Sequence, residues 1–186
     1  LKGMVDRYRN PETQIEFAAK HSMNPKIVAS FADGTKLCME AAVIANATGF
    51  KVGTRGMYGP RCAHVNEIIQ HLPMDQMLAG GIVDYALGAA PYTGAFVVVH
   101  EEHPARKSHL AYFKMGDGPL FVFYAPYHLP HLQIASTIAR AALTGDATVA
   151  PAGAPVCSVA TVAKKDLKAG DVLDGVGGFA SYGLIE

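Results

Sequence analysis

The sequence contains no tryptophan, few charged residues and no excess of either charge sign. Charged residues make up 17% of its 186 residues, and sixteen basic side chains balance sixteen acidic ones. A protein without a net field of one sign does not draw nucleic acid or an anionic membrane surface toward itself. We therefore expect neither nucleic acid nor a membrane among its partners.

Long apolar runs and paired cysteines are also lacking. No stretch approaches the roughly 18 uninterrupted apolar residues of a membrane span, and the N-terminus does not resemble a signal peptide. The three cysteines, Cys38, Cys62 and Cys157, are odd in number and have no CxxC spacing. This pattern predicts neither a disulfide framework nor a zinc knuckle. We expect a soluble protein in a reducing cytoplasm.

The usual fingerprint of a dinucleotide-binding domain, GxGxxG between a strand and a helix, is absent from this sequence. The first residues, LKGMVDRYRN, do not begin with an initiator methionine and lack the polar composition typical of the start of a domain. We therefore expect the chain to be part of a longer protein.

Half of the residues are hydrophobic, which is enough for a sizeable core. Capping signals and apolar patterns predict, in order, a helix from Asn10 to His21, a buried strand at 26–32, a helix capped by Asp33 that ends at Gly49, and a glycine-rich loop at 52–62. Arg55 and Arg61 lie on this loop, which either wraps an anionic substrate or is a surface connection with solvated arginines.

The remaining sequence predicts a short helix at 64–72 and strands at 81–88, 94–102, 108–116 and 119–126, with GDG at 116–118 as a hairpin turn. A long helix is expected from Leu129 to Gly145, followed by an Ala- and Pro-rich boundary and by short C-terminal strands. Hairpins mixed with helices in irregular order indicate an α+β protein with a mixed sheet. The predicted division is 1–150 and 151–186.

The first group of candidate site residues is Asp33, Lys36 and Glu40. The helix dipole disfavours a cation near a helix N-terminus, so the position of Lys36 suggests a role other than helix stabilisation. Lys36 and Glu40 lie four residues apart on one helix face, one turn after Asp33. A partly buried lysine there is suited to proton transfer to a carbonyl or hydroxyl. The alternative is a solvated Lys36 that pairs with Glu40 for about 0.2–0.5 kcal/mol.

The second group lies in KMGDGPLFVFYAPYHLPH, where titratable side chains occur at chain reversals. In a functional interpretation, Tyr127 and His128 orient a substrate or move a proton, and Lys114 or Asp117 binds a polar group. In the alternative, these residues form a hairpin turn and a proline-bounded helix start. His128 and His131 have no nearby carboxylate to complete a metal set, so no metal site is expected.

Three stretches carry a resemblance to a known family: NPKIVASFADGTKLCMEAAVIANATG, KMGDGPLFVFYAPYHLPHLQIASTIARAALTGDATVAP and VATVAKKDLKAGDVLDGVGGFASYGLIE. The chain resembles homoserine-dehydrogenase-like oxidoreductases that end in an SAF domain. One branch of that family acts as a reductoisomerase on 1-deoxy-D-xylulose 5-phosphate. The third stretch looks like the SAF signature, a small all-β module of the β-clip type.

This resemblance implies a catalytic and dimerisation domain at 1–150, truncated at its N-terminus, and an SAF-like module at 151–186. In the family, a Rossmann domain that binds NAD(P)H precedes the catalytic domain, and here it is missing. The resemblance thus implies that this chain alone holds no nicotinamide cofactor and is inactive, and that the protein forms a homo-oligomer.

The family's DG(T/S)K motif falls on residues 33–36, with Glu40 following. The resemblance implies that Lys36 protonates or polarises a substrate carbonyl oxygen as hydride arrives. A lysine-glycine pair of the family corresponds to Lys2 and Gly3, which makes Lys2 a substrate-binding candidate beside Arg55.

Two functions of different classes follow. The first is the substrate-binding and catalytic part of an NAD(P)H-dependent oxidoreductase that acts on a small hydroxylated carbonyl compound, with or without a phosphate. The alternative is a non-catalytic SAF-type protein that binds a sugar-like or anionic small molecule.

Overall fold

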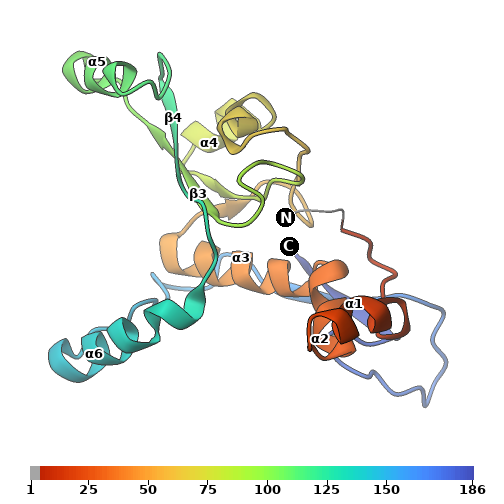
Figure 1. Ribbon diagram of the computed structural model, residues 1–186. Coiled ribbons are helices and arrows are strands. Elements are labelled where there is room, and N and C mark those ends of the chain that lie inside the picture. Colours follow the sequence, from red (N-terminus) through yellow and green to blue (C-terminus); the bar gives the residue numbers. More distant parts are fainter. Residues whose placement is uncertain (1–4) are drawn as a thin grey trace. The chain divides into compact units, whose positions relative to one another are not determined.

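The computed structural model describes residues 5–186, which divide into two compact units (Figure 1). Of the described residues, unit 1 contains 59–81 and 85–150, and unit 2 contains 5–58, 82–84 and 151–186. The predicted domain division at residue 150 stays a prediction, but residues 151–186 share their compact unit with the N-terminal helices.

The N-terminal part of unit 2 is helical. It contains the 3-10 turn η1 (Glu12–Gln14) and the helices α1 (Ile15–Lys20), α2 (Pro25–Ala32) and α3 (Thr35–Thr48). The helix predicted at 10–21 is confirmed, with a 3-10 first turn. The predicted helix end at Gly49 is also confirmed, since this residue has φ 79° and closes α3.

The strand predicted at 26–32 is wrong, because this segment is helix α2. The Asn24 side chain accepts a hydrogen bond from the Lys26 backbone N–H at 2.9 Å, and Pro25 occupies the first helical position. An asparagine cap followed by proline starts a helix strongly. These two signals outweigh the short apolar run, which fits a buried strand and a buried helix equally well.

The C-terminal hairpin of unit 2 packs on α3. Strands β5 (Val159–Ala163) and β6 (Ser181–Ile185) pair antiparallel, with Val159 opposite Ile185. A short parallel pair, β1 (Lys51–Val52) and β2 (Ile82–Val83), belongs to the same unit. At Gly183 the hairpin comes so close to α3 that a Cβ atom would lie 3.0 Å from Cγ2 of Thr35.

Unit 1 is built around the antiparallel strands β3 (Ala95–His100) and β4 (Leu120–Ala125). One face of this ribbon packs on a core near the 3-10 helix η2 (Val65–Gln70) and helix α4 (Met74–Leu78). The buried members of this core are Cys62, Val65, Ile68, Leu72, Ala86, Ala89 and Val122. The strands predicted at 94–102 and 119–126 are therefore confirmed.

The strand predicted at 108–116 is wrong, because helix α5 (Pro104–Tyr112) occupies most of it. Consequently GDG at 116–118 is not the turn of a two-strand hairpin, and β4 pairs with β3 instead. Pro104 stands at the first helical position, and helix-forming residues such as Ala105 and Lys107 follow it. Of the strand predicted at 81–88, only Ile82–Val83 is a strand in the structure.

The long helix predicted from Leu129 to Gly145 is confirmed as η3 (Pro130–Gln133) followed by α6 (Ile134–Thr144). The α+β class is also confirmed. In place of one mixed sheet, the described residues form three separate two-stranded sheets. Within residues 5–186, no helix has the length and apolar character needed to cross a membrane.

Candidate functional site

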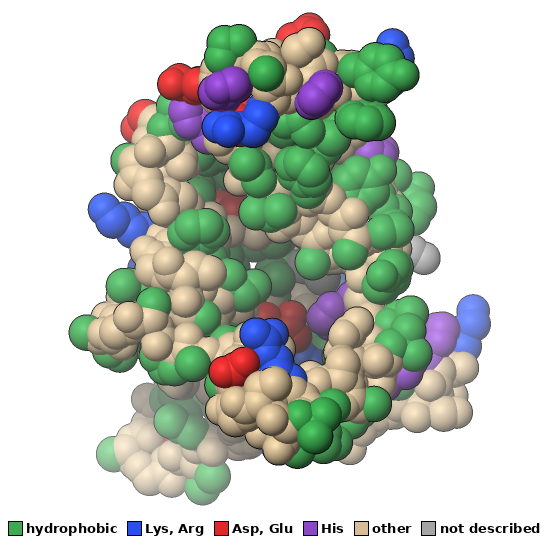
Figure 2. Space-filling view, turned by 90° about the vertical axis from the view of Figure 1, so that its left-hand side faces the viewer, with side chains coloured by type: hydrophobic (Ala, Val, Ile, Leu, Met, Phe, Trp, Pro, Cys, Tyr) green, Lys and Arg blue, Asp and Glu red, His purple; other side chains and the backbone are tan. Residues whose placement is uncertain are grey.

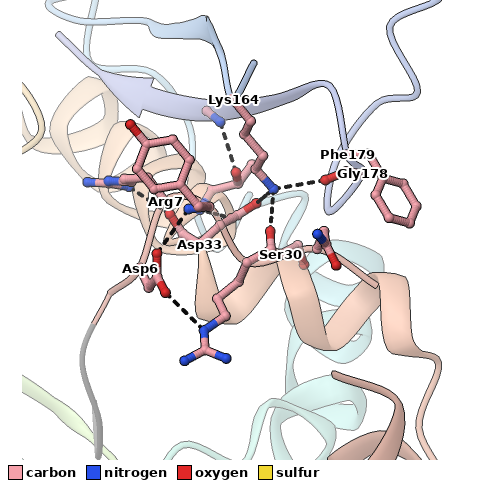
Figure 3. Close-up of polar contacts among 12 residues, drawn as sticks. Asp6, Arg7, Ser30, Asp33, Lys164, Gly178 and Phe179 are labelled. Atoms are coloured by element: carbon pink, nitrogen blue, oxygen red, sulfur yellow. Dashed lines mark hydrogen bonds and ion pairs between the residues drawn. The ribbon is translucent and has the colours of Figure 1, made fainter. Parts of the chain in front are cut away.

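The DGTK turn, residues 33–36, joins α2 to α3 in unit 2, and its aspartate is completely buried. Oδ1 of Asp33 accepts a hydrogen bond from the Thr35 backbone N–H at 2.8 Å. Oδ2 of Asp33 lies 2.8 Å from Nζ of Lys164, which follows strand β5. Figure 3 shows these two side chains pointing toward each other. Both carboxylate oxygens therefore have partners inside the protein.

The ammonium group of Lys164 is fully engaged. Besides Asp33, it donates to the carbonyl oxygens of Arg9 at 2.5 Å and of Gly178 at 2.8 Å, and its side chain is 3% exposed. A lysine ammonium has three N–H donors, and all three are used here. Lys164 consequently has no donor left for a substrate.

The next two residues of the turn are also fixed by contacts. Gly34 has φ 79°, and a Cβ atom there would lie 2.6 Å from Nη1 of Arg7, so the turn needs glycine. That guanidinium donates to the Asp33 carbonyl oxygen at 2.9 Å and lies over the Tyr182 ring. The Thr35 hydroxyl accepts a hydrogen bond from the Gly183 N–H at 2.8 Å.

Lys36 differs from the rest of the turn because its side chain is 45% exposed. Its Nζ lies 3.9 Å from Oε1 of Glu40 and 4.5 Å from the centroid of the Phe31 ring. This pairing is the contact expected from the solvated alternative. The exposed ammonium group of Lys36 remains a cationic hydrogen-bond donor at the surface. A catalytic role for Lys36 therefore stays a prediction.

The predicted site residues fall in both units. Asp33 lies in the turn between α2 and α3, and Lys36 and Glu40 lie one turn apart in the first part of α3, all in unit 2. Arg55, also in unit 2, donates from Nε to Oε2 of Glu186 at 2.7 Å, so it binds a carboxylate of its own chain. Lys2 lies outside the described residues.

The second predicted group belongs to unit 1, and its four side chains are exposed. Lys114 follows helix α5 with φ 62°, and Asp117 lies three residues later in the turn before β4. Tyr127 and His128 lie between β4 and η3. These residues therefore lie at two separate places along the chain of unit 1.

Sequence reasoning missed Lys164, although a signal for it exists. Alternation along β5 places Ala160 and Val162 on its more buried face, and Lys164 continues that face one step beyond the strand. A lysine that continues an inward-facing pattern must find a buried partner, since an unpaired buried charge is strongly unfavourable.

Asp174 shapes the loop that supplies the Gly178 carbonyl to Lys164. Its carboxylate accepts hydrogen bonds from the backbone N–H groups of Phe179 at 2.6 Å and Ala180 at 3.0 Å. Burial raises the pKa of Asp174, but these hydrogen bonds outweigh burial and the pKa is lowered overall. The ionised carboxylate thus stabilises the loop next to the buried pair.

Cysteines and metal-ligating side chains in residues 5–186 have no arrangement that would hold a metal ion. The cysteines are free and buried, and burial raises the pKa of Cys157. Burial, together with the nearby Glu67 carboxylate, also raises the pKa of Cys62. Across the part of the chain that the structure describes, no three His, Cys, Asp or Glu side chains are arranged to hold a metal ion.

In the comparison with known protein families, one family model matches this chain. The family model described as "Oxidoreductase DRL, catalytic domain" matches residues 2–134. Comparison with curated proteins gave no match. The matched segment includes the whole DGTK turn, whereas Lys164 and Gly183 lie beyond its end.

Replacing Lys164 by methionine should destabilise the protein by about 3–5 kcal/mol, because the charge of Asp33 stays buried without its partner. Urea unfolding followed by circular dichroism measures this loss. Lys165→Met is the matched control, since this neighbouring side chain is exposed and should leave stability within about 0.5 kcal/mol. Equal unfolding midpoints for the two variants would contradict the prediction.

Acid should remove the stabilisation that Asp174 provides. Since its pKa is lowered in the folded protein, the contribution is fully present above the ordinary aspartate value and is lost as the pH falls through the lowered value. Asp174→Asn should therefore be less stable than wild type near about pH 7, and this difference should shrink toward about pH 3. Urea midpoints at both pH values test it, and a constant difference would refute it.

Proposed function

This chain belongs to the family of DRL oxidoreductase catalytic domains, and we propose that it is the substrate-binding and catalytic part of an NAD(P)H-dependent oxidoreductase. The family confirms the predicted oxidoreductase class. The substrate class, a small hydroxylated carbonyl compound with or without a phosphate, is supported by the resemblance of the three stretches given above. The same resemblance supports an SAF-like C-terminal segment.

The proposed proton donor is Lys36. Reduction of a carbonyl leaves negative charge on its oxygen, and a cationic donor within hydrogen-bond distance stabilises that charge and supplies the proton. The observation that carries this role is the contrast within the DGTK turn, where Lys36 alone presents a charged group to solvent. Glu40, 3.9 Å from the ammonium, helps to hold it at the surface.

Substrate binding is proposed for exposed polar residues outside the DGTK turn. In unit 2, Arg55 would bind a phosphate or another anion. In unit 1, Lys114 would bind a polar or anionic group, and Asp117 would accept hydrogen bonds from hydroxyl groups. Tyr127 and His128 would orient the substrate. Lys2 is proposed as a further substrate-binding cation, on the resemblance alone.

A nicotinamide site does not fit the residues described here. Dinucleotides bind where a glycine-rich turn links a strand of a parallel sheet to a helix. In residues 5–186 the one pair of parallel strands is β1 with β2, two residues each, beside isolated parallel bridges between Arg61 and Leu87 and between His64 and Ala90, and no GxGxxG sequence follows any of them. We therefore propose that NAD(P)H is held by a Rossmann domain outside this chain, and that the chain alone is inactive.

In the full-length protein, Lys36→Ala should lower kcat by on the order of 10²-fold or more, the range expected for loss of a general acid. Oxidation of NADH and NADPH is followed spectroscopically with a panel of small hydroxycarbonyl compounds, each with and without a phosphate. Lys20→Ala is the control, because this exposed lysine lies on α1.

Unchanged turnover by Lys36→Ala would remove Lys36 from the mechanism. If no compound is turned over while a sugar-like anion binds in residues 154–186, the alternative of a non-catalytic binding protein replaces the enzyme.

We also propose that the protein is a homo-oligomer, with α6 in the interface. Ile134 and Ile138 are 56% and 62% exposed and lie one turn apart on one face, and α6 has no buried residue. Figure 2 shows that hydrophobic side chains are frequent on the surface of one side of the molecule. Large exposed apolar areas of this kind are typical of association surfaces.

The variant Ile138→Asp should shift the full-length protein to a smaller species in analytical ultracentrifugation, because it places a charge within the apolar face of α6. Ser136→Asp is the control, since it lies on the opposite face in the first turn, where a helix tolerates an acidic residue. Identical sedimentation of wild type and Ile138→Asp would exclude α6 from the interface.

A further inference from the structure

We infer that Lys164 is a positioning residue for the reaction: through Asp33 it fixes the first turn of α3, from which Lys36 acts. This inference rests on the proposed role of Lys36. It assigns a function to the C-terminal segment, which lies beyond the part of the chain that the oxidoreductase family matches.

Neither member of the buried pair is available to a substrate. The side chains of Lys164 and Asp33 are 3% and 0% exposed, and every N–H donor of the ammonium already has an acceptor. The buried pair therefore either positions other residues that contact the substrate or only stabilises the folded protein.

A short series of contacts leads from Lys164 to Lys36. Nζ of Lys164 binds Oδ2 of Asp33, and Oδ1 of the same carboxylate receives the N–H of Thr35, the residue that precedes Lys36. The Thr35 hydroxyl is bound in turn by the N–H of Gly183. The C-terminal segment thus holds the residue before Lys36 at two points: its backbone N–H through the Asp33 carboxylate, and its hydroxyl directly.

Backbone fixation matters here because a general acid must come within about 2.6–3.2 Å of the atom that it protonates. The contacts of Phe31 and Glu40 steady the end of the Lys36 side chain, but they do not fix its backbone. If the carboxylate of Asp33 lost its cation, the first turn of α3 would be free to shift. A misplacement of about 1 Å is enough to lower a rate by roughly 10²-fold.

A contribution to stability does not by itself explain why the protein has a buried ion pair here, because apolar residues of similar volume often stabilise a core as well as an ion pair does. Asp33 has a second task that an apolar residue would fail, since its Oδ1 binds the Thr35 N–H. Lys164 holds that carboxylate in place.

A double-mutant cycle in the full-length protein tests the inference. Lys164→Met should lower kcat by on the order of 10-fold to 10²-fold, under conditions where circular dichroism shows the variant folded. In a Lys36→Ala background the same change should have no further effect on kcat, because the group that it positions is gone. Lys165→Met should leave kcat unchanged in both backgrounds.

The possible failures are distinguishable. If Lys36→Ala alone keeps wild-type kcat, the proposed function of Lys36 fails. If Lys36→Ala loses activity while Lys164→Met retains full kcat, or lowers kcat by the same factor in both backgrounds, the positioning role is refuted and the pair is only structural.

Hydrogen exchange gives a readout that needs no substrate. In Lys164→Met the Thr35 amide should be accelerated by a larger factor than the Ala42 amide in the middle of α3, whose acceleration reports the global loss of stability. An equal acceleration of both amides would indicate global destabilisation and overturn the inference.

If Lys164→Met does not fold, Asp33→Leu combined with Lys164→Met replaces it, because this pair buries no charge and offers the Thr35 N–H no acceptor. The double variant should show the same loss of kcat and the same selective exchange at Thr35. Wild-type kcat in a folded double variant would refute the positioning role.

Discussion

The buried ion pair between Asp33 and Lys164 is the constraint on which the architecture of unit 2 depends. Two charges leave water together only if their remaining hydrogen-bonding groups also find partners. The ammonium takes the carbonyl oxygens of Arg9 and Gly178, and the carboxylate takes the Thr35 N–H. Satisfying one pair therefore fixes the N-terminal segment, the start of α3 and the C-terminal loop relative to one another.

Local sequence signals predicted the ends of the helices better than the identity of short apolar segments. Gly49 and Gly145 were predicted as helix ends, and both have positive φ in the structure. The apolar run at 26–32 predicts a strand, and the GDG turn predicts another at 108–116, although Asn24 with Pro25, and Pro104, mark helix starts. A short apolar run carries too little periodicity to separate the two structures, so the capping residues decide.

The candidate site was predictable only as far as its residues are neighbours in sequence. The spacing of Lys36 and Glu40 predicts that they lie on one helix face, one turn after Asp33. The partner of Asp33 lies 131 residues away, and nothing in the DGTK turn indicates which of the basic residues fills that place. The one available signal is the alternation of inward-facing residues along β5, which Lys164 continues. This signal identifies Lys164 as the partner only when Asp33 is already known to be buried.

Two residues that hold the DGTK turn in place lie outside the segment that the oxidoreductase family matches. The match ends at residue 134, yet Lys164 and Gly183, which hold the DGTK turn, come later in the chain. A catalytic domain cut at that boundary would bury the charge of Asp33 without a counterion and remove the donor that binds the Thr35 hydroxyl. Because an unpaired buried charge is so unfavourable, such a fragment would have to open the turn that carries Lys36. The C-terminal segment is thus a structural part of the turn from which the proposed proton donor acts.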